Sequence, residues 1–445
     1  MKTNMGSKWP TKTVDELKAK SRAAIAIGPF GSRMKSDCYV PSGVPVIRGN
    51  NISDTRDLVG ELVYITPEKA QEVQSSIIFP DDLFFPHRGS IGLVGIVPQN
   101  CAAHYVQSSS LMKLTCDRDI VEPLYLFYFF RSPQGRQELL KNASTVGTPG
   151  IGQPLSSLKA IQVPYPPLTE QKAIAAVLGA LDDKIELNRR MNATLEAMAR
   201  ALFQSWFVDF DPVRAKLDGR PPAGLDPATA ALFTDSFQDS PLGPIPHGWT
   251  AGKLGEIGTN SRRGIQPSEI APNTPYIALE HMPRRCIALG DWDESAVVAS
   301  GKSAFKKGEI LFGKLRPYFH KVGIAPFDGV CSTDILVLSP KTAEWFGVLL
   351  GHVSSYELIQ FTDLASTGTK MPRTSWGDLS SFKIALPPKP IAAAFTRVIQ
   401  PMLEHITANV FQSRTLATLR DTLLPKLLSG ELRVAGLESQ LAAAS

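Results

Sequence analysis

The stretch LTEQKAIAAVLGALDDKIELNRRMNATLEAMARALFQSW, residues 168 to 206, decides the architecture of this chain. It has no proline and one glycine, and its apolar residues form two rows that alternate three and four residues apart. One row is Ile174, Leu181, Leu195 and Leu202, and the other is Leu178, Ile185, Ala199 and Trp206. This heptad pattern predicts a coiled-coil helix, roughly 58 Å long at 1.5 Å per residue. Such a helix needs a partner.

The partner helix lies in the same chain. A shift of 221 residues aligns this stretch and the two prolines before it, without a gap, onto PPKPIAAAFTRVIQPMLEHITANVFQSRTLATLRDTLLPKLL, residues 387 to 428. Ile185 then matches Ile406, and Asn188 matches Asn409. Upstream, Gly147 and Thr148 match Gly368 and Thr369. The chain is therefore a duplication, and the repeat has to be interpreted before any fold is assigned.

Asn188 and Asn192 interrupt the apolar seam of the first helix. A buried asparagine at a seam position typically fixes register and partner at some cost in stability. If the two helices pair in antiparallel fashion, positions with equal index sums face each other. Asn188 then lies near Ser413, and Asn192 near Asn409, because both pairs sum to 601. Pro401, inside the second helix, lacks a backbone donor and is expected to kink or interrupt it.

The repeated order of elements predicts an α+β fold with two duplicated α/β domains and two long helices that form an antiparallel intramolecular coiled coil. Each copy runs from a mixed α/β domain through a polar Gly-Thr loop, a short strand and Pro-Pro into the long helix. The expected segments are a first domain at 1–165, a central helix at 166–210, a linker at 211–246 with one short helix near 227–237, a second domain at 247–386, a C-terminal helix at 387–430 and a tail at 431–445. Within the domains, amphipathic helices are expected at 121–140 and 342–362.

Composition narrows the class of protein. The chain has 445 residues, 47 Lys plus Arg against 42 Asp plus Glu, and a pI near 8.8, which is compatible with a nucleic-acid partner. The five cysteines are widely spaced, which favours reduced thiols in a cytoplasmic protein. No apolar run has the length of a membrane span.

Catalytic and metal-binding patterns are absent from the sequence. It contains no phosphate loop, GxGxxG, HExxH or GxSxG motif, and its seven histidines are scattered. Asp81-Asp82 and Asp182-Asp183 are adjacent carboxylates, which we interpret as solvated charges. We therefore expect no cofactor, no metal and no catalytic residue in this chain.

Several stretches resemble the DNA-specificity subunit of type I restriction-modification systems. They are residues 166 to 213, SPLGPIPHGW, GEILFGKLRPY, and STGTKMPRTSWGDL followed by PPKP, and the resemblance covers nearly the whole chain. It implies that the two domains are target-recognition domains, each reading one half of a split double-stranded DNA target, with the helices as a spacer. It also implies partner modification subunits, two of them, that methylate adenine, and restriction subunits that translocate and cleave DNA. The alternative is a coiled-coil scaffold without DNA specificity.

Basic and polar residues that follow strands, or that lie in matching loops of the two copies, are the candidates for DNA contact. Arginine can bridge guanine, and threonine can contact backbone or base. The candidates are Arg48, His87, Arg88, Thr148, Arg262, Arg263, Lys314, Arg316, Thr369, Lys370 and Arg373. For each the alternative is an ordinary solvated surface residue, and for the Gly-Thr loops an ordinary turn.

Overall fold

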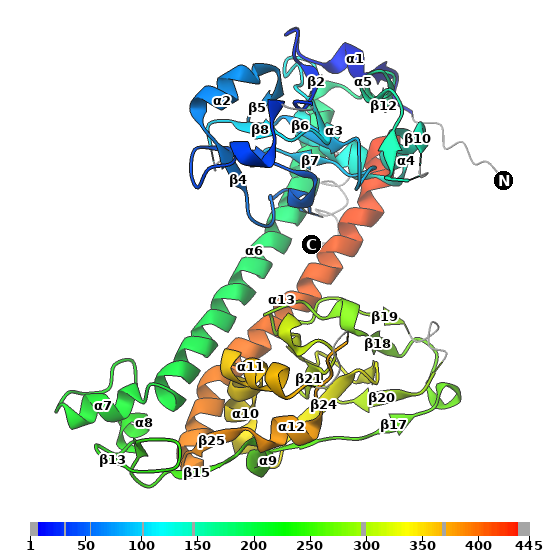
Figure 1. Cartoon of the computed structure of the whole chain (residues 1–445). Coiled ribbons are helices and arrows are strands. Elements are labelled where there is room, and N and C mark those ends of the chain that lie inside the picture. The colour runs from blue at the N-terminus through cyan, green and yellow to red at the C-terminus, as the bar shows by residue number, and fades with distance from the viewer. Residues whose placement is uncertain are drawn as a thin grey trace. The chain divides into compact units, whose positions relative to one another are not determined.

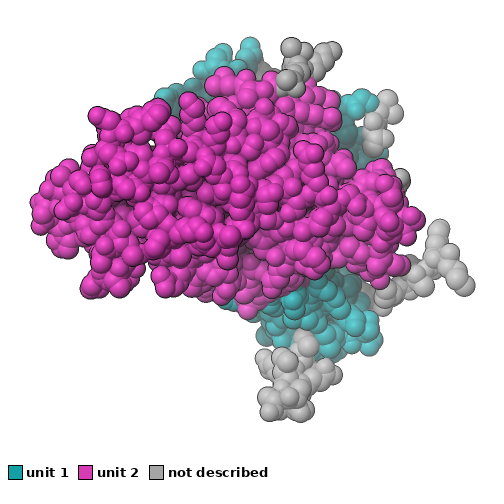
Figure 2. Space-filling view, turned by 90° about the horizontal axis from the view of Figure 1, so that it is seen from below, with its two compact units in different colours: residues 1–186, 415–445 teal, residues 187–414 magenta. Residues whose placement is uncertain are grey.

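The computed structural model describes residues 8–30, 33–53, 55–99, 102–144, 147–294, 300–366 and 371–434. The chain divides into two compact units, one of residues 1–186 and 415–445 and one of residues 187–414 (Figure 2). The division falls inside both long helices, so each unit holds one α/β domain and a segment of each helix. The α+β fold with two duplicated domains and two long helices is confirmed. The six segment boundaries expected from the sequence stay a prediction.

The domain of the first unit is built on two four-stranded sheets (Figure 1). The antiparallel sheet has the order β2 (Ile25–Ile27), β9 (Leu111–Leu114), β6 (Leu83–Pro86) and β7 (Gly95–Ile96). The other has the order β4 (Val63–Ile65), β3 (Val44–Ile47), β8 (Tyr105–Gln107) and β5 (Ile77–Ile78), with β3 and β8 parallel. Short pairs join β1 (Thr11–Thr13) to β12 (Gln162–Pro164) and β10 (Ala143–Ser144) to β11 (Gly150–Ile151). Its helices are α1 (Val14–Leu17), α2 (Pro67–Glu72), α3 (Pro123–Arg131), α4 (Pro133–Leu140) and α5 (Pro154–Lys159).

The domain of the second unit repeats this topology. One sheet has the order β16 (Gly258–Asn260), β24 (Ile335–Pro340), β21 (Ile310–Gly313) and β22 (Val322–Ile324). The other has the order β17 (Gly264–Ile265), β20 (Lys302–Phe305), β23 (Gly329–Cys331), β18 (Pro275–Ile277) and β19 (Asp293–Glu294), again with one parallel pair, β18 and β23. Strand β15 (Thr250–Lys253) pairs with β25 (Lys383–Leu386) as β1 does with β12. Its helices are α9 (Leu254–Ile257), α10 (Phe346–Val353), α11 (Tyr356–Ala365) and α12 (Trp376–Ser381).

The amphipathic stretch expected as one helix in each domain is a pair of helices in both. Ser132 ends α3 and caps α4, because its hydroxyl accepts the Gly135 N–H, and Pro133 prevents α3 from continuing. Ser355 caps α11 in the same way through the Leu358 N–H. A capping serine therefore divides the stretch in each copy.

The long helices are α6 (Leu168–Phe207) and α13 (Lys389–Ser429). Helix α13 runs unbroken through Pro401, so the expected interruption is wrong. Pro401 itself is exposed, while Ile399, Leu403 and Ile406 around it are buried. Burial of these apolar side chains stabilises the helix against the loss of one backbone hydrogen bond.

Polar side chains meet across the helix pair at the expected positions. Asn409 Nδ2 donates to Asn192 Oδ1 at 2.9 Å, and Asn188 Nδ2 lies 2.8 Å from Gln412 Oε1 and 3.2 Å from Ser413 Oγ. Asn188, Asn192 and Asn409 are all buried. The pairs with index sum 601 therefore face each other, and the helices are antiparallel. That these residues fix the register stays a proposal.

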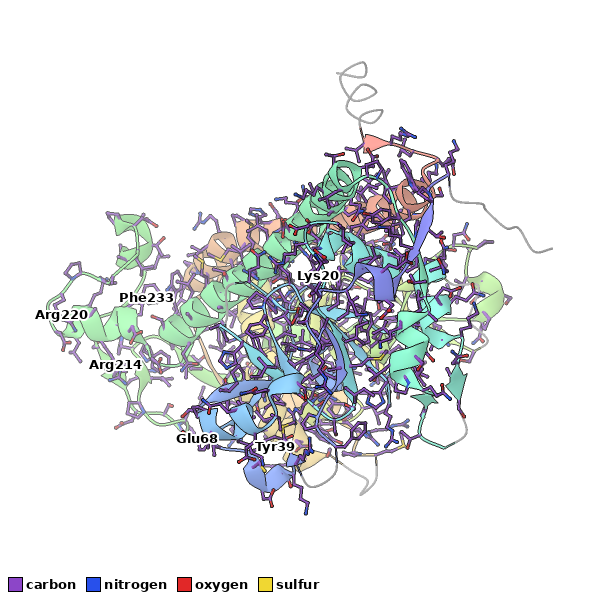
Figure 3. The ribbon with its side chains drawn as sticks, turned by 90° about the horizontal axis from the view of Figure 1, so that it is seen from above. Lys20, Tyr39, Glu68, Arg214, Arg220 and Phe233 are labelled. Carbon is purple, nitrogen blue, oxygen red and sulfur yellow. The ribbon has the colours of Figure 1, made fainter. Side chains whose placement is uncertain are left out.

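The stretch expected as a linker is a folded module that closes the end of α6. It holds α7 (Asp211–Leu217), α8 (Pro227–Ala231) and the paired strands β13 (Phe237–Gln238) and β14 (Ile245–Pro246). Aromatic contacts attach it to the helix: the Trp206 ring lies 5.2 Å from Phe233, and Phe207 lies 5.8 Å from Trp249. The Arg214 guanidinium, in the arm of the chain that Figure 3 labels, lies over the Phe237 ring at 5.2 Å. The Pro- and Gly-rich composition of this stretch did not predict its aromatic core.

Candidate nucleic-acid interface

In the first unit, two loops that carry predicted DNA contacts lie side by side. One follows β6 and contains Arg88, and the other precedes α5 and contains Thr148. Arg88 forms a bridge with Gly150, the Gly89 N–H donates to the Pro149 carbonyl at 2.9 Å, and the Ile151 N–H donates to the His87 carbonyl at 2.9 Å. Both Arg88 and Thr148 are exposed. The strand end thus places a cation and a hydroxyl on one exposed surface.

The second unit builds the same arrangement from its own residues. The loop after β21 contains Lys314 and Arg316, and it lies beside residues 372–374, which precede α12. Leu315 forms a bridge with Arg373, the Arg316 N–H donates to the Pro372 carbonyl at 2.8 Å, and the Thr374 N–H donates to the Lys314 carbonyl at 3.0 Å. The structure therefore brings Lys314, Arg316 and Arg373 together. We call each of these two constructions a loop pair.

The charges of the second loop pair are held at the surface in different ways. The Arg373 guanidinium lies 3.5 Å from the Asp334 carboxylate, and both side chains remain partly exposed. Arg316 adopts a left-handed backbone, with φ of 51°, and its guanidinium lies 5.9 Å from the Phe319 ring. The Nε atom of Arg316 is buried and has no hydrogen-bond partner among the described residues. A non-glycine residue in this conformation is uncommon and often functional.

His87 is a core residue and not a surface contact. Its side chain is 3% exposed, its Nε2 lies 3.0 Å from the Ser109 carbonyl, and its backbone N–H donates to the Ser110 carbonyl at 2.9 Å. Burial lowers the pKa of the His87 imidazole, so the ring is neutral at pH 7. The expectation that His87 reaches DNA is therefore wrong, because the ring supports the loop from inside.

The remaining candidates are partly engaged by the protein itself. The Arg48 guanidinium donates to the Glu61 carbonyl at 3.0 Å, and Arg263 forms an ion pair with Glu309. Arg262 is exposed. Thr369 and Lys370 lie outside the described residues. The loop pairs are accordingly the best-supported part of the predicted interface.

One exposed aromatic beside the first loop pair was not among the predicted contacts. Phe30 is 56% exposed, and its ring lies 6.3 Å from that of His87. Tyr318, 47% exposed, follows Arg316 in the second loop pair. An exposed aromatic ring can stack on bases or sugars. Residues 28–30 have no regular secondary structure, and no motif in the sequence marked the Phe30 ring as exposed.

Two carboxylates interpreted as solvated are buried. Asp82, 3% exposed, accepts the Phe79 N–H at 2.9 Å, and burial raises its pKa. Asp182 accepts the Tyr128 hydroxyl at 2.7 Å and the Arg420 guanidinium at 2.6 Å, and the Arg131 guanidinium lies 3.6 Å away. The solvated interpretation is wrong for both, and the partners of Asp182 come from elements that are distant in sequence. Asp182 ties α3, α6 and α13 together within the first unit.

Comparison with known proteins assigns the family. The model of the type I restriction modification DNA specificity domain matches residues 30–197 and 246–409, which include most of both domains and the greater part of both helices. The chain belongs to this DNA specificity family. The described residues of both loop pairs lie within the matched ranges.

Curated relatives share the family across most of their length. The type I restriction enzyme MjaIX specificity subunit of Methanocaldococcus jannaschii is 29% identical over 395 residues, 84% of each chain. The HindI specificity subunit of Haemophilus influenzae is 26% identical over 380 residues, 74% of this chain and 82% of its own. The type I restriction-modification S subunit from M. genitalium has a similar fold, with a TM-score of 0.56 at 17% identity over 96% of this chain and 98% of that one.

Among the described residues, no helix has the length and apolar character needed to span a membrane. The same residues contain no group of three or more His, Cys, Asp or Glu side chains that could hold a metal ion.

Proposed function

We propose that this chain is the DNA-recognition subunit of a type I restriction-modification complex. It binds double-stranded DNA in the cytoplasm and reads a target of two separated half-sites, one with each domain. It holds two modification subunits and the restriction subunits in place and carries no catalytic residue itself. The observation that supports this function best is the loop pair, which occurs twice, once in each domain of a chain that belongs to the DNA specificity family.

The loop pairs supply the chemistry that DNA recognition needs. Arg88 and Thr148 in one domain, and Lys314, Arg316 and Arg373 in the other, combine cations for phosphates with groups that can reach base edges. Their backbones are held by hydrogen bonds to the facing loop, so the side chains are presented from a fixed frame. Because the residues differ between the copies, the two half-sites are expected to differ in sequence.

Methylated adenines mapped in a host that carries the complete system will define the target. Arg88→Ala should relax the methylated motif in one half-site alone, and Arg373→Ala in the other. On a duplex with the mapped target, each substitution should weaken binding by about 1–3 kcal/mol, or roughly 5- to 150-fold. Arg220→Ala, which removes an exposed arginine outside both loop pairs, is the matched control.

The outcomes separate DNA recognition from a scaffold role. Sequence-specific binding that falls steeply with salt supports the proposal, since phosphate contacts release counterions. Variants of Arg88 and Arg373 that bind and methylate as Arg220→Ala does would show that the loop pairs are not the interface. A chain that binds every duplex equally would favour the scaffold alternative.

A further inference from the structure

Two loops of the second unit meet beside the second loop pair and place an arginine on an aromatic ring. One loop follows η6 (Leu279–His281) and contains Arg284, and the other, between β21 and β22, contains Phe319. The Arg284 guanidinium lies over the Phe319 ring, 3.9 Å from its centroid. The guanidinium of Arg316, a member of the loop pair, lies 5.9 Å from the same centroid. The Phe319 ring therefore joins Arg284 to the surface that we assign to DNA.

A hydrogen bond and an unusual backbone hold the two loops in a defined arrangement. The Arg285 N–H donates to the His320 carbonyl at 2.8 Å, which ties the residue after Arg284 to the residue after Phe319. Arg285, Arg316 and His320 have positive φ, at 55°, 51° and 49°. They are three of the seven non-glycine residues with positive φ in the part of the chain that the structure describes. Such strained residues concentrate at ligand-binding sites, which points to a binding role for these loops.

The stacked arrangement leaves the hydrogen-bond donors of Arg284 available. A guanidinium that stacks through its flat face keeps its N–H groups in the plane, where they can bind a phosphate bidentately. Arg284 is exposed, and no hydrogen bond or ion pair engages its guanidinium within the described ranges of the chain. Stacking on Phe319 also reduces the rotamer freedom that the side chain loses on binding. Arg284 is thus oriented for an anion that the described part of the protein does not supply.

Positive charge predominates around Arg284. Burial lowers the pKa of Lys321, and the nearby Arg284 guanidinium lowers it further, while the exposed Glu280 carboxylate opposes this shift. Arg316, on the same aromatic ring, adds a third cation. Cations that lie close together repel each other, and a bound anion relieves the repulsion. A DNA phosphate is such an anion, and it is the ligand group expected beside a loop pair that reads DNA.

The first unit uses the corresponding loop differently. Its loop after η3 (Gly49–Asn51), which follows β3 as η6 follows β18, contains Arg56. Arg56 forms an ion pair with Asp183 of α6, and its Nη2 donates to the Gly179 carbonyl of the same helix at 3.4 Å. This arginine is engaged by its own chain. A phosphate contact from this loop is therefore expected beside one half-site alone.

We propose that Arg284 binds a DNA phosphate next to the half-site that the second loop pair reads, and that Phe319 is its positioning residue. This inference rests on the proposed function, which supplies double-stranded DNA as the ligand. A phosphate contact adds affinity that does not depend on sequence and that falls with salt. Arg284 therefore strengthens binding to every duplex, while the loop pair selects the sequence.

The first experiment measures the salt dependence of DNA binding by the full chain in complex with its modification subunits. Arg284→Ala should weaken binding to the mapped target and to an unrelated duplex by the same factor, roughly tenfold at low salt. The slope of log K against log[salt] should become shallower by about one, and the methylated motif should not change. A partly unfolded variant loses active protein without a change of slope, so the slope separates a lost contact from lost folding.

Arg214→Ala is the matched control for Arg284→Ala. Arg214 is also exposed and also lies over an aromatic ring, that of Phe237 at 5.2 Å, but it belongs to the module after α6 (Figure 3). It removes the same chemical group from the same kind of stack. The affinity and the slope should both stay those of the unmodified complex.

Variants of Phe319 test its positioning role. Phe319→Leu keeps an apolar side chain but removes the ring, so it should weaken binding about threefold, while Phe319→Tyr should bind as the unmodified complex does. Arg284→Ala should weaken binding less in the Phe319→Leu background than in the unmodified chain, because the two residues act together. Equal losses in the two backgrounds, or an altered methylated motif in Phe319→Leu, would show that the ring does not position Arg284.

A second experiment locates the phosphate on the DNA. Uncharged methylphosphonates replace, one at a time, the phosphates within and next to the half-site whose motif Arg373→Ala relaxes. With the unmodified complex, a substitution next to this half-site should weaken binding, and Arg284→Ala should remove that loss. The proposal is overturned if every such substitution weakens the Arg284→Ala complex as much as the unmodified one.

The two proposals fail in different ways. If the unmodified complex reads a split target and Arg284→Ala keeps the affinity and slope of Arg214→Ala, Arg284 is not a phosphate contact, while the proposed function stands. If Arg284→Ala changes the methylated motif, Arg284 reads a base, and the phosphate assignment is overturned. If the unmodified complex shows no sequence-specific binding, the proposed function fails, and this inference fails with it.

Discussion

Replacing Asp182 by alanine tests how the first unit is held to the helix pair. The carboxylate is 7% exposed and is bonded to Tyr128 and Arg420, with Arg131 close by. Removing it takes the buried counter-ion from two largely buried guanidinium groups, while Arg420 keeps its ion pair with the exposed Asp421. Breaking a buried ion pair costs about 3–5 kcal/mol, because a largely buried charge loses its buried counter-ion. We expect a loss of this size in Asp182→Ala.

The neighbouring aspartate gives a matched control. Asp183 forms an ion pair with Arg56, but its side chain is 71% exposed. An exposed pair contributes about 0–1 kcal/mol. Asp183→Ala removes the same chemical group one position further along α6, so it isolates the effect of burial.

Hydrogen exchange measured by mass spectrometry reads the effect locally. Peptides that cover α3 and residues 415–429 report on the elements that Asp182 joins. Under conditions where exchange follows the opening equilibrium, 3–5 kcal/mol corresponds to roughly 140- to 4,000-fold faster exchange. Exchange in Asp182→Ala that stays within about threefold of Asp183→Ala would refute the reasoning.

A double variant separates the unpaired charge from lost packing. Asp182→Leu with Arg420→Ala reproduces the residues of the second copy, Leu403 and Ala199. Because both main partners are removed, the destabilisation should be smaller than in Asp182→Ala. A double variant that is less stable than the single one would show that the network contributes through geometry and not through its charges.

Three further outcomes are expected. Burial lowers the pKa of His352 to about 3, so the unfolded chain binds more protons than the folded chain below pH 6.5. The free energy of unfolding of the second unit, followed by tryptophan fluorescence, should therefore fall by about 3 kcal/mol between pH 7 and pH 4. His352→Leu should reduce this loss. Asn192→Leu leaves Asn409 buried without the amide that it donates to, so the free energy of unfolding should fall by about 1–3 kcal/mol. The double variant Asn192→Leu with Asn409→Leu should recover most of that stability in the same unfolding assay. One heptad added to both helices lengthens each by roughly 10.5 Å. If the helix pair lies parallel to the duplex, the methylated half-sites should move apart by about three base pairs. An unchanged spacer between the methylated half-sites would reject the idea that the helices set the spacing.

The sequence predicted the helix pair because the evidence for it is local and repeated. Heptad spacing marks α6, and the 221-residue shift carries it onto α13, so the facing of Asn192 and Asn409 follows from arithmetic. The strand after which each loop pair begins was also predictable, since an apolar run ends there in a basic residue. These features depend on neighbours in the chain.

The features that were mispredicted depend on distant residues. Asp182 resembles any exposed helix carboxylate until Arg420, 238 residues away, is known to face it. His87 is buried because the backbone of Ser109 and Ser110 covers it, and no periodic pattern shows this. The module after α6 reads as a linker from its Pro and Gly content, yet Phe233 and Trp249 attach it to the helix end. Each error is a tertiary contact that overrides local composition.

We propose that the polar pairs give the two helices one favoured register. A slip of one heptad would put Ser413 or Leu427 opposite Asp182 in place of Arg420, and Met402 or Leu416 opposite Asn192 in place of Asn409. Either slip takes Arg420 from the buried Asp182 and leaves a buried amide unpaired, at a cost of several kcal/mol. A heptad inserted into one helix alone must break one of the two pairs. Insertion into both, after residues 186 and 414, keeps Asp182 with Arg420 and Asn192 with Asn409, so only this variant tests the spacing without also testing stability.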